Sequence, residues 1–544
     1  MPGQLEPTGG VQLPVLVVGG GPVGMTAALL LARWGLRVVL LEQRTSRQVV
    51  GSRSICQHRD VLDIWAAVGA GAQIAAEGVT WRTARTYWRD HELIALTLRD
   101  PGRSPFPPFV NISQSRTEQI LTERVAATSL IETRWGHEVT AIEQDATGVA
   151  ARCRTDQGEV GVQGAYAVVS AGGRADGLRG HLGASFAGTT FDDQFLICDI
   201  RCTLPGWEVE RRFFFDPAWN PGRQVLIHPC PDSTYRIDWQ VPPDFDLDAE
   251  ERSGGLDRRI RQIVSTVPYE LVWRSVYRFD SRCVDRMRVG RVLLAGDCAH
   301  LMAPFGARGL NSGVQDAENA AWKIAFVLNH WAPEDLLESY HAERHAAARE
   351  NLDVTAATMR FLVPHTKAER AAREAALRAV LRDPTAGSRV DSGRLAEPYW
   401  YAGSPLTTPD PSRPAPARPP RGALPPATPG VLAPDVPIEI ADRPQVTRLR
   451  EIARDGLLAL TTADPFEVER VLKRATDAPC RSYSIDEIDA TGAVGDVLGV
   501  RPGETWLIRP DAHIAAVLPQ SSPQHALAAA VWRAVGQRGI RQRN

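Results

Sequence analysis

The sequence predicts an α/β protein built from more than one domain, and three observations lead to this prediction. The chain has 544 residues, which is too long for a single hydrophobic core of ordinary size. Near the N-terminus an apolar run, a helical pattern and a second apolar run follow one another, as in a strand–helix–strand unit. Twelve prolines between Pro405 and Pro437 then separate the main body from a shorter α/β segment.

The composition is that of a soluble globular protein, with 44% hydrophobic and 23% charged residues. The formal net charge of −2 gives no reason to expect nucleic acid or an anionic membrane as partner. Arg33 and Arg37 interrupt the most apolar stretch, so we expect no membrane span. Eight scattered cysteines without a CxxC pair predict no metal site. Those thiols, and an N-terminus without the pattern of a secretory signal, predict a cytoplasmic location.

The N-terminal elements follow from local patterns. Residues 11–20 are predicted as a buried strand and residues 21–35 as a helix, which ends at Gly35 after Arg33. Residues 36–42 are predicted as a second buried strand. The later elements are predicted as a helix at 52–69, strands near 81–99 and 134–170, an aromatic β-rich segment at 210–241, helices over 314–362 and a small α/β unit over 438–544.

The turn between the first strand and helix carries the G-x-G-x-x-G pattern at Gly19, Gly21 and Gly24. The first glycine permits a tight turn, the second lets a pyrophosphate approach the backbone, and the third allows close helix–strand packing. The helix N-terminus favours the negative phosphates. Glu42 ends the second strand, where an acid accepts hydrogen bonds from ribose hydroxyls. The pattern predicts a dinucleotide but does not distinguish NAD from FAD.

Residues 296–324 place an acid, a histidine and several glycines between an apolar strand and a helical pattern. Together with the glycine fingerprint, this stretch resembles the FAD-dependent aromatic hydroxylases of the para-hydroxybenzoate hydroxylase type, which are class A flavoprotein monooxygenases. The nearest likeness is the branch of the 3-(3-hydroxyphenyl)propionate hydroxylases and polyketide-tailoring monooxygenases. The resemblance is strong over residues 14–365 and continues weakly to the C-terminus.

The resemblance implies FAD as cofactor and assigns residues to it. Asp297 would accept hydrogen bonds from the ribityl hydroxyls, Arg53 would lie near the diphosphate, and Gln114 would contact FAD through its amide. Helix 313–330 would direct its positive end at the flavin, where it favours negative charge. The positions expected to line the flavin ring are Pro304, which we count among the catalytic residues, Gly306, Gly309, Leu310 and Asn311.

One position departs from the family pattern. The family usually has an Asp-Gly pair near residue 170 that contacts FAD and, by inference, the reduced nicotinamide. Here Gly172 stands where the acid is expected, and the only Asp-Gly pair nearby, Asp176–Gly177, is shifted by four residues. Either this loop is rebuilt or the acid is lost, which affects the nicotinamide step more than FAD binding.

The resemblance also implies a reaction. NADPH or NADH would reduce the flavin, O₂ would add at its C4a carbon, and the resulting hydroperoxide would hydroxylate a phenolic or polycyclic aromatic substrate. Alignment places His228, Cys230 and Asp238 at substrate-facing positions, with His228 or Asp238 taking the phenolic proton. In the structural alternative, His228 is satisfied within the sheet and Asp238 pairs with an arginine. His300 is assigned to loop structure.

Two other functions stay open. One keeps the fold but catalyses Baeyer–Villiger oxygenation or epoxidation in polyketide biosynthesis. The other is a flavin-binding protein without turnover. The C-terminal segment resembles the thioredoxin-like domain of many such hydroxylases, on the basis of residues 506–517. Because it lacks CxxC, we expect a packing role or a homodimer contact.

The expected architecture is a Rossmann-like FAD-binding domain interleaved with a β-sheet substrate domain, followed by a thioredoxin-like domain. Its boundaries are 1–190 and 281–380 for the two parts of the FAD-binding domain, 191–280 for the substrate domain, 381–437 for the proline-rich connection and 438–544 for the C-terminal domain.

Overall fold

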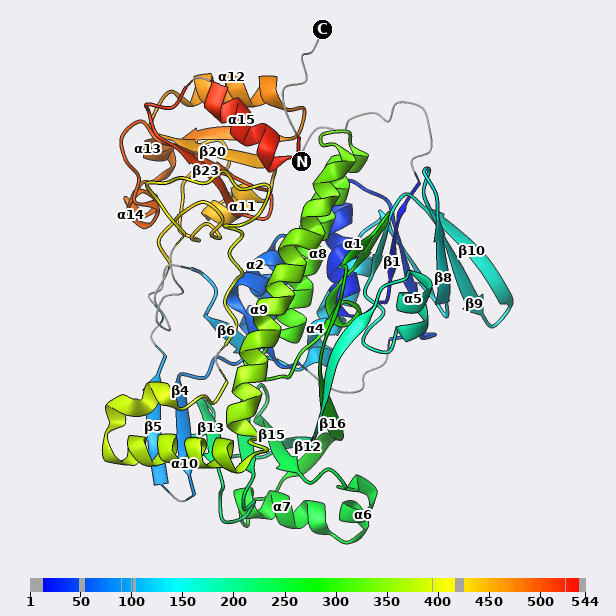
Figure 1. Ribbon diagram of the computed structural model, residues 1–544, viewed down its shortest axis with the longest axis vertical. Coiled ribbons are helices and arrows are strands. Elements are labelled where there is room, and N and C mark those ends of the chain that lie inside the picture. The colour runs from blue at the N-terminus through cyan, green and yellow to red at the C-terminus, as the bar shows by residue number, and fades with distance from the viewer. Residues whose placement is uncertain are drawn as a thin grey trace.

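The protein is described by a computed structural model that covers residues 13–47, 54–89, 91–98, 100, 104–393, 395–415, 425–523 and 525–537. Arg53 lies outside the described residues. Within them the chain forms a six-stranded, an eight-stranded and a four-stranded sheet, with smaller sheets of two and three strands. Helices α8 (Gly309–Leu328) and α9 (Glu338–Leu362) run through the middle of the molecule, as Figure 1 shows.

The six-stranded sheet has the strand order β17-β18-β11-β1-β2-β7. The glycine-rich turn follows β1, one of its inner strands. Its inner strands are parallel and buried along their whole length, which explains why they are continuous apolar runs. Helix α1 begins with a proline at its first position and packs against α8. The bounds are β1 (Val15–Val18), α1 (Pro22–Arg33), β2 (Val38–Glu42), α4 (Gln114–Ala126), β7 (Ile131–Trp135), β11 (Ala167–Val169), α5 (Asp176–His181), β17 (Arg288–Val289) and β18 (Val292–Leu294).

The eight-stranded sheet has the order β19-β16-β12-β15-β14-β13-β4-β5 and is antiparallel except for the pair of β13 and β4. Helix α7 packs on one face, and helix α10 covers β5. The other face turns toward the loop that precedes α8, where Phe195 and Phe279 of the sheet pack against Phe305. The bounds are β4 (Thr83–Trp88), β5 (His91–Thr97), β12 (Phe186–Arg201), β13 (Glu210–Phe215), β14 (Gln224–Cys230), β15 (Thr234–Val241), α6 (Leu247–Arg252), α7 (Gly255–Val264), β16 (Glu270–Val284), β19 (His300–Leu301) and α10 (Lys367–Arg382).

Smaller elements connect these two sheets. Strand β3 and two short helices lie between β2 and β4, and β3 forms a two-stranded sheet with β6, which follows β5. An antiparallel three-stranded sheet follows β7. Short 3-10 turns follow β18, precede α9 and follow α10. The bounds are β3 (Cys56–His58), α2 (Arg59–Ala66), α3 (Gly71–Glu77), β6 (Phe109–Asn111), β8 (Glu138–Gln144), β9 (Val149–Thr155), β10 (Gly158–Gly164), η1 (Gly296–Cys298), η2 (Glu334–Leu337) and η3 (Pro384–Arg389).

The C-terminal unit packs beside α8, as Figure 1 shows in orange and red. Trp322 and Phe326 of α8 enter an apolar core shared with this unit. Asp63 of α2 is buried there and accepts hydrogen bonds from Arg448 at 2.8 Å and Arg454 at 2.6 Å. The bounds are α11 (Leu449–Ala453), β20 (Leu457–Thr461), α12 (Pro465–Ala475), β21 (Cys480–Ser484), α13 (Ile485–Ile488), α14 (Ala493–Leu498), β22 (Thr505–Ile508), β23 (Ile514–Leu518) and α15 (His525–Ala534).

Local patterns placed most elements near their observed positions. The predicted strand–helix–strand unit is present, and residues 210–241 form three strands. The predicted helix at 52–69 is shorter, because a strand occupies residues 56–58 and pairs with β6. The eight-stranded sheet also includes β4 and β5, from residues 83–97, and β19, from residues 300–301. These strands lie far from residues 210–241 in the sequence, so local patterns do not reveal that they join the same sheet.

Candidate active site

The three fingerprint glycines differ in what surrounds them. Gly19 has a φ of +103° and lies under Ser170, whose carbonyl oxygen would be 2.5 Å from an added Cβ. An added Cβ at Gly24 would be 1.9 Å from the Gly19 carbonyl oxygen, so this glycine permits close packing of α1 on β1. Gly21 has no atom within 4 Å of an added Cβ and lines the main cavity at the N-terminus of α1. This open space at the N-terminus of α1, which no side chain caps, fits a diphosphate.

Glu42, the last residue of β2, lines the same cavity as the glycine turn. We call the glycine turn and Glu42 together the dinucleotide cradle. One carboxylate oxygen accepts a hydrogen bond from the Gly20 amide at 2.6 Å, and the other accepts from the Arg44 amide and Nε. Burial alone would raise the pKa of Glu42, but the hydrogen bonds from Arg44 and Gly20 outweigh burial and hold the pKa below its ordinary value. Glu42 is therefore a fixed carboxylate that lines the cavity.

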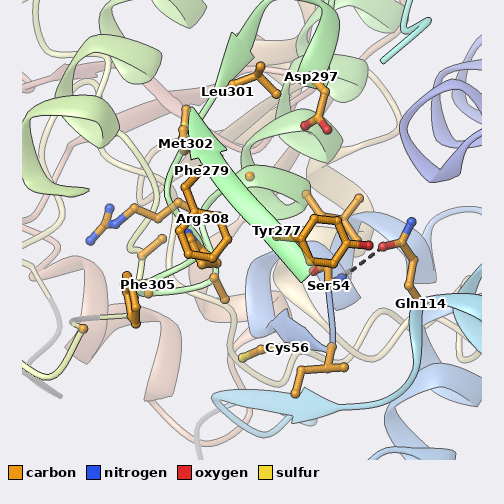
Figure 2. Close-up of a pocket in the computed structure, with 18 of the residues that line it drawn as sticks. Ser54, Cys56, Gln114, Tyr277, Phe279, Asp297, Leu301, Met302, Phe305 and Arg308 are labelled. Atoms are coloured by element: carbon orange, nitrogen blue, oxygen red, sulfur yellow. Dashed lines mark hydrogen bonds between the residues drawn. The ribbon is translucent and has the colours of Figure 1, made fainter. Parts of the chain in front are cut away.

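Gln114 and Asp297 lie on different sides of the same cavity. Gln114 begins α4, accepts a hydrogen bond from the Ser54 amide at 3.0 Å and donates one to Glu118 at 2.8 Å. Asp297 stands on the turn η1, directly after β18. Figure 2 shows the side chains of Gln114, Asp297 and Tyr277 directed into one space.

The loop after Asp297 follows the cavity wall into α8. Pro304, Gly306, Gly309 and Leu310, which were expected to line the flavin ring, line this cavity. The side chain of Asn311 is used elsewhere: it accepts from the His58 amide at 2.9 Å and donates to the carbonyls of Cys56 and Ala307. Asn311 is almost fully buried and does not line the cavity, so it fastens the start of α8 to β3.

The cavity continues from this cradle onto the inner face of the eight-stranded sheet. It encloses about 2720 Å³, whereas pockets for one small molecule usually measure roughly 300–1,000 Å³. There is thus room for a dinucleotide and a sizeable second ligand. The sheet residues that line this second half are Phe195, Ile197, Arg211, Leu226, His228, Arg236, Asp238, Trp273, Ser275, Tyr277 and Phe279.

A polar group lies among these apolar walls. Arg236 donates both of its nearby N–H groups to Asp199, at 2.8 and 2.9 Å, and is thereby paired. Asp238 Oδ1 and His228 Nδ1 are buried, and among the described residues neither atom has a hydrogen-bond partner. Two polar atoms in an apolar chamber without a partner suit a bound polar ligand.

Burial in this chamber shifts the pKa values of Asp238 and His228 in opposite directions. Burial raises the pKa of Asp238 to about 7, against the attraction of Arg236. Burial, with Arg211 and Arg236 nearby, lowers the pKa of His228 well below its ordinary value. At neutral pH the imidazole is therefore uncharged, and the carboxyl lies near the midpoint of its titration.

Sequence reasoning missed two parts of this chamber. The first is β16, where Trp273, Tyr277 and Phe279 occupy alternate positions facing the cavity. That period-two aromatic pattern was visible in the sequence. Phe279 also packs against Phe195, with ring centroids 4.8 Å apart, and against Phe305. Phe305 belongs to the loop between Asp297 and α8, which we call the flavin-side loop.

The second missed part is the start of the connection after α10, and only tertiary contacts reveal it. Residues 384–393 and 395–397 contribute to the cavity wall. Arg211 donates to both the hydroxyl and the carbonyl of Ser392, Thr358 donates to Asp391 at 2.6 Å, and the Ala396 amide donates to the Gly306 carbonyl at 3.0 Å. We call residues 384–397, apart from the undescribed residue 394, the wall segment.

The loop that departs from the family pattern presents glycine to the cavity. Gly172 has a φ of +78° and lines the cavity. Asp176 does not line it: its side chain is 83% exposed and pairs with Arg179 at 2.6 Å. The shifted Asp-Gly pair therefore does not bring an acid back to this part of the site.

Taken together, the described residues fit FAD. The glycine turn leaves space at a helix N-terminus, Glu42 and Asp297 offer carboxylates to hydroxyl groups, and the loop into α8 supplies a glycine-rich wall for a planar ring. Among the described residues no cluster of His, Cys, Asp and Glu has the arrangement of a metal site. Within the same residues no helix is both long and apolar enough to cross a membrane.

Comparisons with known proteins agree with this fit. A family model described as "FAD binding domain" matches residues 12–355. The chain is 28% identical over 393 residues to a 3-(3-hydroxy-phenyl)propionate/3-hydroxycinnamic acid hydroxylase of Mycobacterium avium, covering 68% of this chain and 65% of the relative. It is 31% identical over 366 residues to a flavin-dependent monooxygenase of Mycobacteroides abscessus, covering 63% and 73%. The matched region thus spans slightly less than two thirds of the hydroxylase relative.

Solved structures share the fold across almost the whole chain. The flavin-dependent monooxygenase PieE, in complex with FAD and substrate, superposes with a TM-score of 0.82 at 22% identity, covering 97% of this chain and 100% of that one. Aklavinone-11 hydroxylase, in a ternary complex with FAD and aklavinone, superposes with a TM-score of 0.75 at 22% identity and the same coverage.

Proposed function

We propose that this chain, which belongs to the FAD binding domain family, is a single-component monooxygenase that hydroxylates a phenolic or polycyclic aromatic substrate with O₂ and NADPH or NADH. One observation carries the proposal: a dinucleotide cradle shares one cavity with an aromatic chamber, in which one carboxyl oxygen of Asp238 has no partner among the described residues. The hydroxylase and monooxygenase names of the relatives support it.

FAD, when bound, supplies the transfer of two electrons from the nicotinamide to O₂, so that one oxygen atom enters the substrate and the other leaves as water. The chain's own residues bind and orient. With FAD bound, Glu42 and Asp297 would accept hydrogen bonds from cofactor hydroxyls. The N-terminus of α8, which begins at Gly309 on the cavity wall, would favour negative charge there.

The aromatic walls would hold the substrate ring and keep water out. Phe195, Phe279 and Phe305 form a cluster where the substrate half meets the flavin-side loop, with ring centroids 4.8 to 6.3 Å apart. Offset and edge-to-face contacts of this kind suit another aromatic ring. Pro304 precedes the cluster and lines the same cavity.

Asp238 is the better proton acceptor for a phenolic hydroxyl. A general base works best when its pKa lies near the operating pH, and the pKa of Asp238 is about 7. His228, whose pKa is depressed, binds a proton too weakly for that role but can accept a hydrogen bond through its unpartnered Nδ1. Removing the phenolic proton makes the ring more electron-rich and thus more reactive toward the transferred oxygen.

The test is to purify the protein, record its flavin spectrum, and follow oxidation of NADH and NADPH with a panel of phenols and polycyclic aromatics. Product mass after reaction under labelled O₂ should increase by one labelled oxygen atom. If neither nucleotide bleaches the flavin with any member of the panel, the proposal fails. Identification of the product as a phenol, a lactone or an epoxide separates hydroxylation from Baeyer–Villiger oxygenation and epoxidation.

Gly172 and the exposed Asp176 favour a second candidate, a flavin-binding protein that nicotinamides do not reduce. Chemical reduction distinguishes the two. If dithionite-reduced protein oxygenates an aromatic substrate but NADPH and NADH have no effect, only the nicotinamide step is missing. If reduced protein and O₂ yield no product either, the second candidate is correct.

We also propose a thioredoxin-like fold for residues 438–544 and retain the predicted domain boundaries. Parallel β20 and β21, connected through α12 and followed by an antiparallel hairpin of β22 and β23, support this fold. Cys480 is free there, which argues against disulfide exchange. The other described cysteines are free as well, in keeping with a cytoplasmic location. Light scattering would decide between a monomer and a homodimer.

A further inference from the structure

Asp316 lies on α8, in the interior of the protein next to the turn that carries Asp297. Its side chain is fully buried and touches no part of the cavity. One carboxylate oxygen accepts from the Gly296 amide at 3.0 Å and from His300 Nε2 at 2.8 Å, and the other accepts from Arg344 Nε at 2.6 Å. Asp316 therefore holds both ends of the short turn that carries Asp297.

This turn has little room to shift. Gly296 has a φ of +59°, and an added Cβ would lie 3.1 Å from Val23 at the start of α1. An added Cβ at Gly313 of α8 would lie 2.6 Å from Val23 and 3.1 Å from the Gly296 Cα. The turn is thus enclosed between α1 and α8, and Asp316 holds it from the side of α8.

Arg344 connects Asp316 with the rest of the protein. It is buried on α9 and donates to the carbonyl and hydroxyl of Ser312 at 3.1 Å and to the Tyr401 hydroxyl at 3.0 Å. Tyr401 belongs to the connection, and its ring lies 4.3 Å from that of His513 in the C-terminal unit. An unbroken series of buried contacts therefore leads from the C-terminal unit to the turn of Asp297.

The charge of Asp316 is secured by its neighbours. Burial would raise its pKa, but the positive charge of Arg344 and the hydrogen bonds from His300 and Gly296 lower the pKa to about 2. The carboxylate of Asp316 therefore remains ionised at neutral pH.

We propose that Asp316 is a positioning residue that sets the geometry of Asp297 and thereby the affinity for FAD, and that Tyr401, through Arg344, couples docking of the C-terminal unit to the same turn. The proposal rests on FAD binding and is independent of which substrate is oxygenated. It gives the C-terminal unit a role that needs no redox-active cysteine pair.

The first test replaces the charge of Asp316 while keeping its size. Apoprotein of Asp316→Asn is titrated with FAD, and the dissociation constant is read from quenching of flavin fluorescence. We expect FAD binding at least about tenfold weaker, together with a shifted visible spectrum of the bound flavin. Asp199→Asn is the matched control, because it also breaks a buried carboxylate–arginine pair but lies in the substrate sheet.

Unfolding midpoints of the apoproteins separate positioning from stability. Both variants should unfold at lower temperature, and only Asp316→Asn should bind FAD more weakly. If Asp316→Asn binds FAD within twofold of the unmodified protein while its midpoint falls, Asp316 is structural only and the proposal is wrong. Should Asp316→Asn not fold, His300→Gln tests the same turn under the same criterion.

The second test concerns the coupling. Tyr401→Phe removes the hydroxyl that accepts from Arg344, and we expect FAD binding about three- to tenfold weaker. Tyr235→Phe is the control, since that buried hydroxyl bonds to the Leu204 carbonyl on the far side of the substrate sheet. Equal FAD affinity in Tyr401→Phe and Tyr235→Phe would refute the coupling and leave the role of Asp316 standing.

Discussion

Replacing Asp238 by asparagine should remove the pH dependence of the chemical step. The carboxyl lies in an apolar chamber, its Oδ1 has no partner among the described residues, and burial raises its pKa to about 7. In the unmodified protein roughly a tenth of the groups are ionised at pH 6 and roughly nine tenths at pH 8. If the carboxylate takes the phenolic proton, kcat/KM rises with pH through this interval.

The magnitude follows from the usual contribution of a general base, which is about 10²- to 10⁴-fold. Asp238→Asn should lower kcat/KM by at least about 10²-fold at pH 8 and give a flat profile between pH 6 and 8. Asp280→Asn is the matched control, because Asp280 lines the same cavity but accepts a hydrogen bond from Thr190. Rates of substrate-dependent NADPH oxidation and of product formation are measured across the pH range.

Stability gives an independent check with a known sign. The folded-state pKa of Asp238 is raised from an ordinary value of 3.8 to about 7, so the folded protein binds more protons than the unfolded chain between these values. This group therefore lowers the free energy of unfolding as pH rises from about 4 to 7. Asp238→Asn should be the more stable protein at pH 8. A variant that keeps the rising pH profile, or that is less stable at pH 8, would refute the assignment of Asp238.

Three further predictions concern separate parts of the site. Gly24→Ala should abolish FAD binding and lower the unfolding midpoint, because its Cβ would meet a backbone oxygen at 1.9 Å, whereas Gly21→Ala should weaken FAD binding and leave the apoprotein midpoint nearly unchanged. His228→Gln should raise KM for phenols several-fold and keep the pH profile, since the imidazole is already neutral at pH 6 to 8. Arg211→Met should release the wall segment at Ser392, which would appear as faster amide hydrogen exchange there and a higher KM, with FAD affinity unaltered.

The cofactor half of the site could be predicted because its signals are contiguous. Gly19, Gly21, Gly24 and Glu42 lie within one strand–helix–strand unit, whose apolar runs and helical spacing are readable without any partner. Asp297 and the loop after it likewise form one continuous phrase. The structure places these residues around one cavity, except Gly24, which packs the helix onto the strand behind it.

The substrate half could not be predicted to the same depth, because its chemistry depends on pairing across strands. The register of β12 against β15 sets Asp199 opposite Arg236, and their ion pair leaves Asp238 with an unpaired oxygen. The period of two along a strand places Arg236 and Asp238 on the same face of β15, but it carries no information about which acid the arginine meets.

By itself the sequence determined the dinucleotide cradle, the order of the elements and the β-rich segment 210–241 that contributes to the cavity wall, because hydrophobic periodicity and backbone requirements act over a few residues. Tertiary structure alone decided that Asp238 Oδ1 has no hydrogen-bond partner among the described residues, that residues after α10 form part of the chamber wall and that Asp316 holds the turn of Asp297. Each of these depends on groups far apart in the chain, whose desolvation and hydrogen bonds exist only once the sheets and helices have packed together.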